Sequence, residues 1–287
     1  MLSVNSNNSA LFAAKAVYNT QNLMNKAMER LSTGKRINSA KDDAAGQTIS
    51  ARLTAETQGL VIASRNAADS QSLINTAEGA LKETHTILLR IRELSVQAIN
   101  GTLMFLDRDA LDTEAKLFFY EVERIATNTK WGGINILDGS GNFTFQIGFK
   151  NTSSDRLTVN ISDMGSHPLG LTTDNSGDGR FGAGDSMHGL EQVAWAESLL
   201  NAVDTSIERV STERGKLGAA SNRLDSTIAN LNQIRANLSA SKGRIEDADF
   251  AVETGNLAKS QILQQAATAM LAQANASKSS ILALVKL

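Results

Sequence analysis

The sequence has no cysteine, only one proline and few aromatic residues. The lack of cysteine excludes disulfide bonds, cysteine-ligated zinc sites and thiol nucleophiles. Pro168 is the single proline, and aromatic residues make up 5% of the chain. Because proline interrupts helices and aromatic residues are frequent in strands, these shortages favour long helices over a sheet-dominated fold.

The chain also lacks a charge excess and a long apolar run. Its formal net charge is −2, so no nucleic-acid partner is predicted. No run reaches the ~18 apolar residues of a membrane helix, so no membrane insertion is expected. Asn and Ser interrupt the first ten residues, so no cleavable signal peptide is predicted. Composition alone favours a cytoplasmic protein, and export without a cleaved signal is the alternative.

The glycines are concentrated in the middle of the chain. Of 21, 12 lie between Gly132 and Gly189, which predicts long helices flanking a short glycine-rich region. Within it, apolar residues alternate with polar ones on both sides of the turn-like segment 150–155, which predicts a β-hairpin. These apolar residues are Phe143, Phe145, Ile147, Phe149, Leu157, Val159 and Ile161.

Apolar residues repeat every seven positions in the flanking segments, which predicts coiled-coil packing of the helices. The second segment carries Leu53, Leu60, Ala67, Ile74, Leu81 and Leu88, with a companion line of Ala63, Ser70, Ala77, Thr84, Ile91 and Ala98. The segment after the middle carries Val203, Val210, Leu217, Leu224, Leu231 and Leu238. A shorter helix is predicted over about 107–130, with Leu111, Ala115, Phe118, Val122 and Ile125 on one face.

The two terminal segments carry thinner stripes. The N-terminal one is Ala10, Ala14, Val17, Gln21, Met24, Met28 and Leu31. The C-terminal one is Leu263, Ala267, Met270, Ala274, Ser277, Ile281 and Leu284. Burial of Ala contributes much less than the roughly 1.5–3 kcal/mol of a large apolar side chain. We therefore expect residues 1–42 and 245–287 to be loosely ordered in the monomer and to become helical on polymerisation.

Five separated blocks resemble the two terminal halves of bacterial flagellins. They are RLSTGKRINSAKDDAAGQTISARL (30–53), LLRIRELSVQAINGT (88–102), RIATNTKWGGINILDGS (124–140), SNRLDSTIANLNQIRANLSASKGRIEDADFAVET (221–254) and KSQILQQAATAMLAQAN (259–275). The resemblance covers about 1–160 and 190–287. Trp131 stands where the family commonly has Phe.

The resemblance implies a mainly α fold of long antiparallel coiled-coil helices from both chain halves, with a small β-hairpin region. Residues 1–42 and 245–287 would form an inner terminal coiled coil. Residues 43–244 would form a helical rod domain that includes the hairpin and glycine-rich loop of 132–189. The seam residues of polymerisation would be Val17, Met24, Leu31, Leu263, Met270, Ile281 and Leu284.

The same resemblance implies an extracellular structural subunit of the flagellar filament, which serves motility. Its partners would be other copies of itself, together with the flagellar export apparatus, a chaperone and the filament cap. Export would be in the unfolded state, without a cleaved signal peptide. Two alternatives stay open: a flagellin-like surface protein with an added ligand-binding role, and the hook–filament junction protein.

In flagellins a surface of the long helix is recognised by an innate immune receptor of animal hosts. The matching residues are Arg90, Leu94 and Glu114, although Leu89 stands where the family usually has Gln. The alternative that we favour is structural, with Arg90 and Glu114 as helix-surface charges buried between subunits.

Two apolar runs depart from the family pattern. Leu103–Leu106 follows Asn100-Gly101-Thr102, where the family has polar residues, and 117–120 is also unusually apolar. An exposed apolar patch often marks an interface. We interpret it as a packing surface peculiar to this protein, with a ligand site as the lesser alternative.

The sequence predicts neither an enzyme nor a cofactor. His85, His167 and His188 are not in an H-E-x-x-H zinc motif, and no nucleophile elbow or phosphate-binding glycine loop occurs. The segment DNSGDGRFGAGD offers Asp174, Asp178 and Asp185 as weak calcium ligands. Asp185 stands where calcium loops have Glu, so a glycine-rich surface loop is the favoured interpretation.

Overall fold

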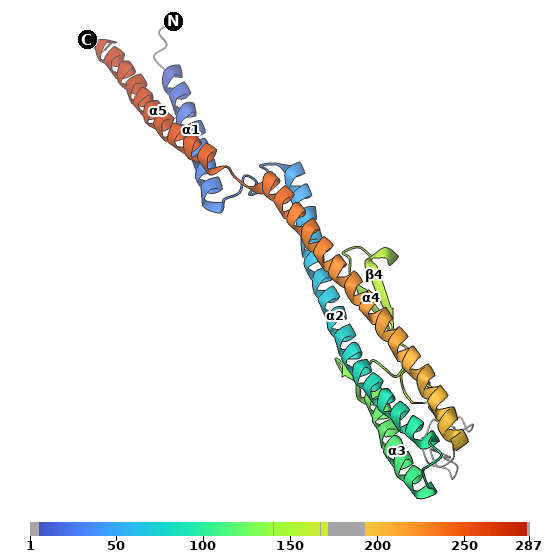
Figure 1. Ribbon diagram of the computed structural model, residues 1–287. Coiled ribbons are helices and arrows are strands. Elements are labelled where there is room, and N and C mark those ends of the chain that lie inside the picture. The colour runs from blue at the N-terminus through green and yellow to red at the C-terminus, as the bar shows by residue number, and fades with distance from the viewer. Residues whose placement is uncertain (1–5, 140, 167, 172–192, 286–287) are drawn as a thin grey trace. The chain divides into compact units, whose positions relative to one another are not determined.

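The computed structural model describes residues 6–139, 141–166, 168–171 and 193–285, without the side chains of residues 195 and 278–285. Figure 1 shows a mainly helical chain, as predicted. The helices are α1 (Asn8–Thr33), α2 (Ala44–Ile99), α3 (Phe105–Asn128), α4 (Val193–Glu246) and α5 (Phe250–Val285). The strands are β1 (Lys130–Trp131), β2 (Ile134–Asn135), β3 (Asn142–Gln146) and β4 (Arg156–Asn160), with a 3-10 turn at Ser153–Asp155. None of the described helices is long and apolar enough to cross a membrane.

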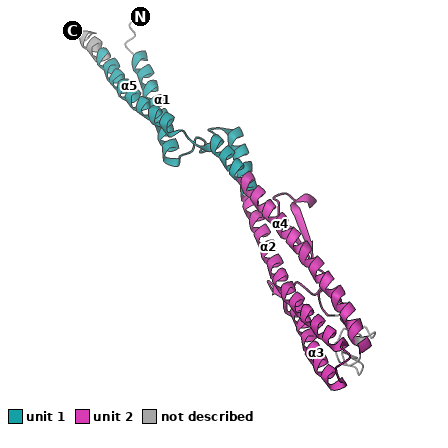
Figure 2. Ribbon diagram, viewed as in Figure 1, with its two compact units in different colours: residues 1–57, 236–287 teal, residues 58–235 magenta. Residues whose placement is uncertain are grey.

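The chain divides into two compact units, and each contains segments from both halves of the sequence (Figure 2). Unit 1 comprises residues 1–57 and 236–287, and unit 2 comprises residues 58–235. These limits fall inside α2 and α4.

Unit 2 is built on the antiparallel pair of α2 and α4. Its predicted heptad lines are confirmed, because every member of the α2 lines from Leu60 onward and of the α4 line up to Leu224 is buried. Contacts between the two helices show their relative direction. They join Gln71 with Asp225 (2.8 Å), Glu78 with Arg214 (2.7 Å) and Arg92 with Asp204 (2.6 Å). As the residue number rises on α2 it falls on α4, so the helices run in opposite directions.

Helix α3 and the β-hairpin complete the core of unit 2. The predicted α3 face is confirmed, since Ala115 and Val122 are buried and Leu111, Phe118 and Ile125 pack against the core. The β3–β4 hairpin is also confirmed, with Phe143 opposite Val159 and Phe145 opposite Leu157. The short β1–β2 pair was not predicted, and its turn uses Gly132 and Gly133, both with positive φ.

Two carboxylates hold the irregular chain that follows β4. Glu213 of α4 accepts hydrogen bonds from the backbone N and the hydroxyl of Ser162, at 3.2 and 3.3 Å. Glu123 of α3 accepts the equivalent pair from Ser166, at 2.9 and 2.7 Å. The two helices thereby provide acceptors for backbone groups that lie outside any sheet.

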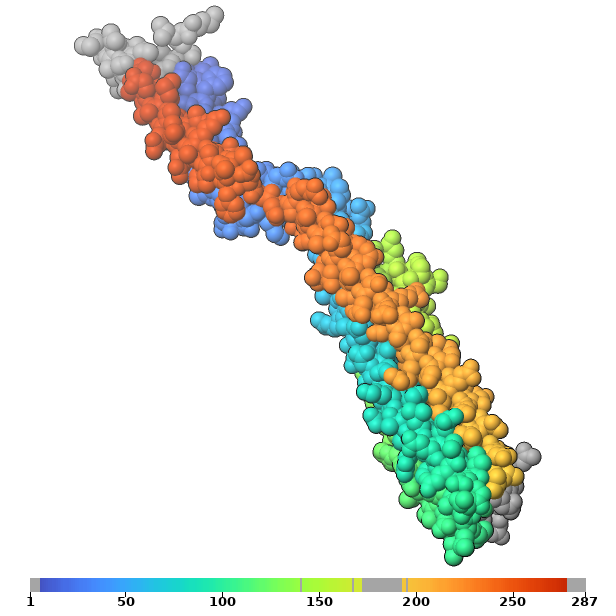
Figure 3. Space-filling view, in the orientation of Figure 1, coloured from blue at the N-terminus to red at the C-terminus, as the bar shows by residue number. Residues whose placement is uncertain are grey.

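Unit 1 contains the antiparallel pair of α1 and α5. In Figure 3 the side chains of α5 (red) lie along those of α1 (blue). Helix α1 ends at Gly34, which adopts the left-handed conformation (φ 70°) and donates its backbone N–H to Arg30 O. At the start of α5, Asp249 Oδ1 accepts hydrogen bonds from the backbone N of Ala251 and Val252.

Candidate assembly surface

The face of α1 that meets α5 is made of small and polar residues. The least exposed positions follow steps of three and four: Ala10, Ala13, Val17, Thr20, Met24, Ala27 and Leu31. The predicted seam residues Val17, Met24 and Leu31 all lie on this line. The other predicted line lies only partly on this face: Gln21 is half-buried and contacts α5, whereas Ala14 and Met28 are exposed and Ala13 and Ala27 lie in the seam instead.

The face of α5 that meets α1 shares Ala267 and Ala274 with the predicted stripe but not Leu263 and Met270. Its least exposed positions are Glu253, Leu257, Ser260, Gln264, Ala267, Leu271 and Ala274. Leu263 and Met270 lie outside this line and are 42% and 65% exposed. Ile281 and Leu284 fall in the helix, but their side chains lie outside the described residues. Leu263 and Met270 therefore face away from the intramolecular seam.

Polar contacts fix the register of the α1–α5 pair. Asn7 Nδ2 donates to Ala274 O at 3.0 Å, and Gln264 Nε2 donates to Gln21 Oε1 at 2.5 Å. Arg30 Nη1 pairs with Glu253 Oε1 at 2.7 Å in a largely buried position. Hydrogen bonds of this kind determine alignment, while each adds only about 1 kcal/mol of net stability.

The large apolar side chains of the pair point away from the seam. They are Leu11, Phe12, Tyr18, Leu23 and Met28 on α1, and Phe250, Val252, Ile262, Leu263 and Met270 on α5. The sequence interpretation missed most of them because it followed one stripe per helix. A second apolar stripe on each helix, outside the heptad line, was the sequence signal that could have identified these residues. A soluble monomer rarely exposes so many large apolar groups unless they form a contact surface.

The turns at the base of the pair are held by charges. The Lys26 ammonium lies 3.0 Å from Asp42 Oδ1. Hydrogen bonding from Lys26, followed by the backbone N–H groups of Ser39 and Asn38, lowers the pKa of Asp42 to about 2. The Ser50 hydroxyl donates to Glu246 and lowers the pKa of that carboxyl.

The proposed receptor residues lie at the α2–α3 contact in unit 2. Arg90 Nη2 pairs with Glu114 Oε1 at 2.9 Å, and Nη1 pairs with Glu93 at 3.0 Å. The hydrogen bonds that Arg90 donates to Glu114 and Glu93 raise its pKa, so it stays charged. Leu94 is buried in the core cluster. The structure thus brings Arg90 and Glu114 together at the surface, and Leu94 beneath it.

The apolar departures form a partly exposed surface on α3. Met104, Phe105 and Leu106 are exposed at its start, and Leu117 and Tyr120 are exposed further along. Phe119, which lies between them in sequence, is buried in the core. Leu106, Leu117 and Tyr120 share one face of the helix, since they differ by eleven and three residues.

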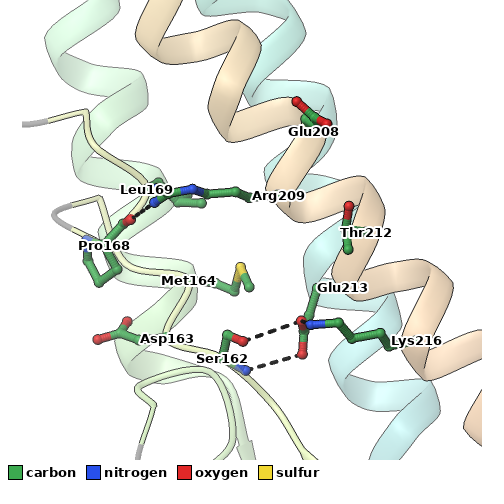
Figure 4. A pocket seen from close by; sticks show the side chains of 10 residues that line it. All are labelled: Ser162, Asp163, Met164, Pro168, Leu169, Glu208, Arg209, Thr212, Glu213 and Lys216. Atoms are coloured by element: carbon green, nitrogen blue, oxygen red, sulfur yellow. Dashed lines mark hydrogen bonds and ion pairs between the residues drawn. The ribbon is translucent and has the colours of Figure 1, made fainter.

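A hollow of unit 2 lies between α4 and the irregular chain that follows β4 (Figure 4). It has a volume of about 520 Å³. Arg209 reaches across it to Pro168 O, and Glu213 reaches Ser162. Its polar groups are therefore used to hold the segment in place.

No three His, Asp or Glu side chains gather as metal ligands in the described part of the chain. The weak calcium candidates Asp174, Asp178 and Asp185 lie outside that part.

Comparison with known proteins matches both ends of the chain to one family. Residues 4–142 match the bacterial flagellin N-terminal helical region, and residues 200–285 match the C-terminal helical region. A flagellin of Bacillus subtilis is 39% identical, with 99% of each chain covered. The chain belongs to the bacterial flagellin family. It is accordingly a structural subunit of the extracellular flagellar filament, where flagellins self-assemble.

One further relative agrees with this placement, and one solved structure shares the fold. The flagellar filament 33 kDa core protein of Treponema phagedenis is 35% identical, with 99% of each chain covered. A solved structure of a hook-associated protein from Vibrio parahaemolyticus aligns with a TM-score of 0.56 at 16% identity. It covers 72% of this chain and 100% of that one, and it shows the shared flagellin-type fold alone.

Proposed function

We propose that the chain joins the filament through the exposed faces of α1 and α5, which pack against the terminal helices of other copies. One observation carries this proposal: the large apolar residues of the pair lie outside its seam, while Ala, Thr, Ser and Gln fill much of the seam. In this arrangement the predicted seam residues Leu263 and Met270 act between molecules rather than within one.

The energetics favour assembly over an isolated helix pair. Full burial of a Leu, Met or Phe side chain contributes about 1.5–3 kcal/mol, whereas ordering one residue costs roughly 1–2 kcal/mol of backbone entropy. A seam of small residues offsets this cost poorly. Packing between copies buries the outer apolar residues as well, so residues 1–42 and 245–287 gain most of their order on polymerisation.

We further propose that the chain is exported unfolded, with the flagellar export apparatus, a chaperone and the filament cap as partners. A chain without cysteine has no disulfide to block threading through a narrow channel. In this proposal the N-terminus is not cleaved during export. The protein has a structural role and no catalytic one. Intact-mass measurement of subunits released from filaments tests the first point, and a mass lower by an N-terminal peptide would contradict it.

For the α2–α3 surface we propose a packing role first. Arg90 and Glu114 form an exposed ion pair that a neighbouring subunit covers in the filament. A host innate immune receptor would meet these two charges only on the free monomer, and buried Leu94 would contribute through their positioning. We assign the exposed α3 residues Leu106, Leu117 and Tyr120 to subunit packing in the same way.

Seeded growth tests the main proposal. Purified monomer is mixed with short filament seeds in ammonium sulfate, which strengthens apolar burial, and filament length is followed by electron microscopy. We expect the full chain to extend seeds and a variant without residues 1–42 and 245–287 to fail. Replacement of Ile262 and Met270 by Ser should slow growth strongly, since both side chains are exposed in the monomer.

The matched control replaces two exposed apolar residues of unit 2, Ile62 and Val96, by Ser. Growth of the truncated chain at the normal rate would contradict assembly through the ends. No growth of the full chain from competent seeds would instead favour a junction or surface-binding role.

A further inference from the structure

A cationic groove lies on one flank of the α1–α5 pair. It has a volume of about 290 Å³ and opens between the two helices. Leu23 and Leu263 contribute apolar walls, and Lys26, Arg30 and Lys259 contribute positive charges, against the single acid Glu253. A hollow of this size admits one or two side chains rather than a helix.

One of the three positive charges of the groove is not paired within the described residues. Lys26 is paired with Asp42 at 3.0 Å, and Arg30 is paired with Glu253 at 2.7 Å. Lys259 is exposed and has no ion pair with any described residue. Arg30 Nε is buried without an acceptor among the described groups. An incoming carboxylate would therefore meet the unpaired ammonium of Lys259 at the exposed edge of the groove, beside a buried guanidinium N–H that still lacks an acceptor.

The same unit presents an acidic and aromatic corner between α4 and α5. Asp247 is exposed, and within the described part of the chain its carboxylate has neither a cation nor a hydrogen-bond donor. Asp249 is exposed and caps α5, and the Phe250 ring is 57% exposed beside it. Arg244 lines the same corner, so the charge that complements the groove is the unpaired carboxylate of Asp247, and each surface has an apolar part.

The corner of one molecule does not reach its own groove. Phe250 begins α5 and Lys259 lies nine residues further on the same helix, which corresponds to about 14 Å along a rigid axis. The two surfaces can meet only between molecules. A contact between two different patches is heterologous, and repetition of such a contact builds an open helical assembly.

We propose that the groove of one copy receives the corner of a neighbouring copy, with Asp247 paired to Lys259 and Phe250 packed between Leu23 and Leu263. This inference rests on assembly through the terminal helices and names one contact within it. The apolar faces alone do not determine how two copies align. The charge pair would supply this specificity, because complementary charges fix the register of an interface.

Charge exchange tests the pairing. Lys259→Glu and Asp247→Lys are made singly and together in the full-length chain, and the seeded elongation rate is measured at low and high salt. Each single variant should elongate about tenfold more slowly, as expected for loss of one interfacial charge pair. The double variant should return to within about threefold of the original rate. The single-variant defects should shrink at high salt, where screening is strong.

Lys82→Glu is the control, since it makes the same charge change on an exposed lysine of unit 2 that has no ion pair with a described residue. It should elongate normally. Circular dichroism of each variant checks that helicity is unchanged. Unaltered rates for both single variants, or a double variant as slow as the singles, would overturn the pairing. A slow Lys82→Glu variant would attribute the effect to net charge and would also overturn it. In these cases the truncated chain, still inactive, would leave the proposed function intact.

Discussion

At the scale of single residues, buried Glu213 is the acceptor that holds the chain after β4. Its replacement by Ala would remove the acceptor of the partly buried hydrogen bond from the Ser162 backbone N–H, and a hydrogen bond to a charged group contributes about 1.5–3 kcal/mol. We expect Glu213→Ala to lower the free energy of unfolding of unit 2 by that amount in urea titration. Glu208→Ala removes an exposed carboxyl beside the same hollow and should change it little. Equal effects of the two would mean that the Ser162 contact adds no stability.

Also at this scale, Asp42 gives the turn between α1 and α2 a pH dependence. Its pKa in the folded chain is about 2, below the ordinary value of 3.8, because Lys26 and nearby N–H groups donate to it. The folded state therefore binds this proton less readily than the unfolded state. The stabilisation is present above pH 3.8 and is lost as the pH falls through about 2.

NMR titration of the Asn38 and Ser39 amides reports this transition, since both donate to Asp42 Oδ2. We expect a midpoint near 2 that disappears in Asp42→Asn. A midpoint near the ordinary value would show that the turn does not perturb the carboxyl.

At the scale of secondary-structure elements, the sequence predicted the helices of unit 2 better than those of unit 1. In α2 and α4 the heptad lines are rich in Leu, Ile and Val and have one apolar face, so the buried face could be recognised. In α1 and α5 one apolar face meets the partner helix and another is exposed. Periodicity identifies both faces but does not say which of them is intramolecular. The periodic spacing of Leu263 and Met270 on α5 therefore belongs to the exposed apolar face and not to the face that meets α1.

Helix α2 contacts the turn of the β-hairpin through a glycine, which gives a second element-scale test. A Cβ on Gly59 would lie 2.8 Å from Phe149 Cβ, whereas a Cβ on Gly79 of the same helix would meet nothing within 4 Å. Gly79→Ala should stabilise unit 2 by about 1 kcal/mol through helix propensity. Gly59→Ala should destabilise it by about 1 kcal/mol because the hairpin must move. Thermal unfolding compares the two, and a stabilising Gly59→Ala would show that the hairpin yields freely.

At the scale of the whole molecule, apolar burial is unequally divided between the two units. The large core cluster lies entirely within residues 67–224, in unit 2. In unit 1 the buried apolar side chains are few and small apart from Ile37 and Leu53. The two units should therefore differ in local stability, because regions with few buried apolar contacts open at a lower free energy than the core.

Hydrogen exchange of the monomer and of the filament measures this difference. In dilute monomer we expect slow exchange in the helices and the β3–β4 hairpin of unit 2. We expect fast exchange in residues 6–42 and 245–285, since their seam is made largely of Ala, Thr, Ser and Gln. In the filament both ends should become protected by orders of magnitude as their outer apolar faces are covered. The Ile262→Ser, Met270→Ser variant should keep the unit 2 pattern, which separates the two effects. Strong protection of both ends in the monomer would mean that the α1–α5 pair is stable alone, and assembly would then add contacts without adding order.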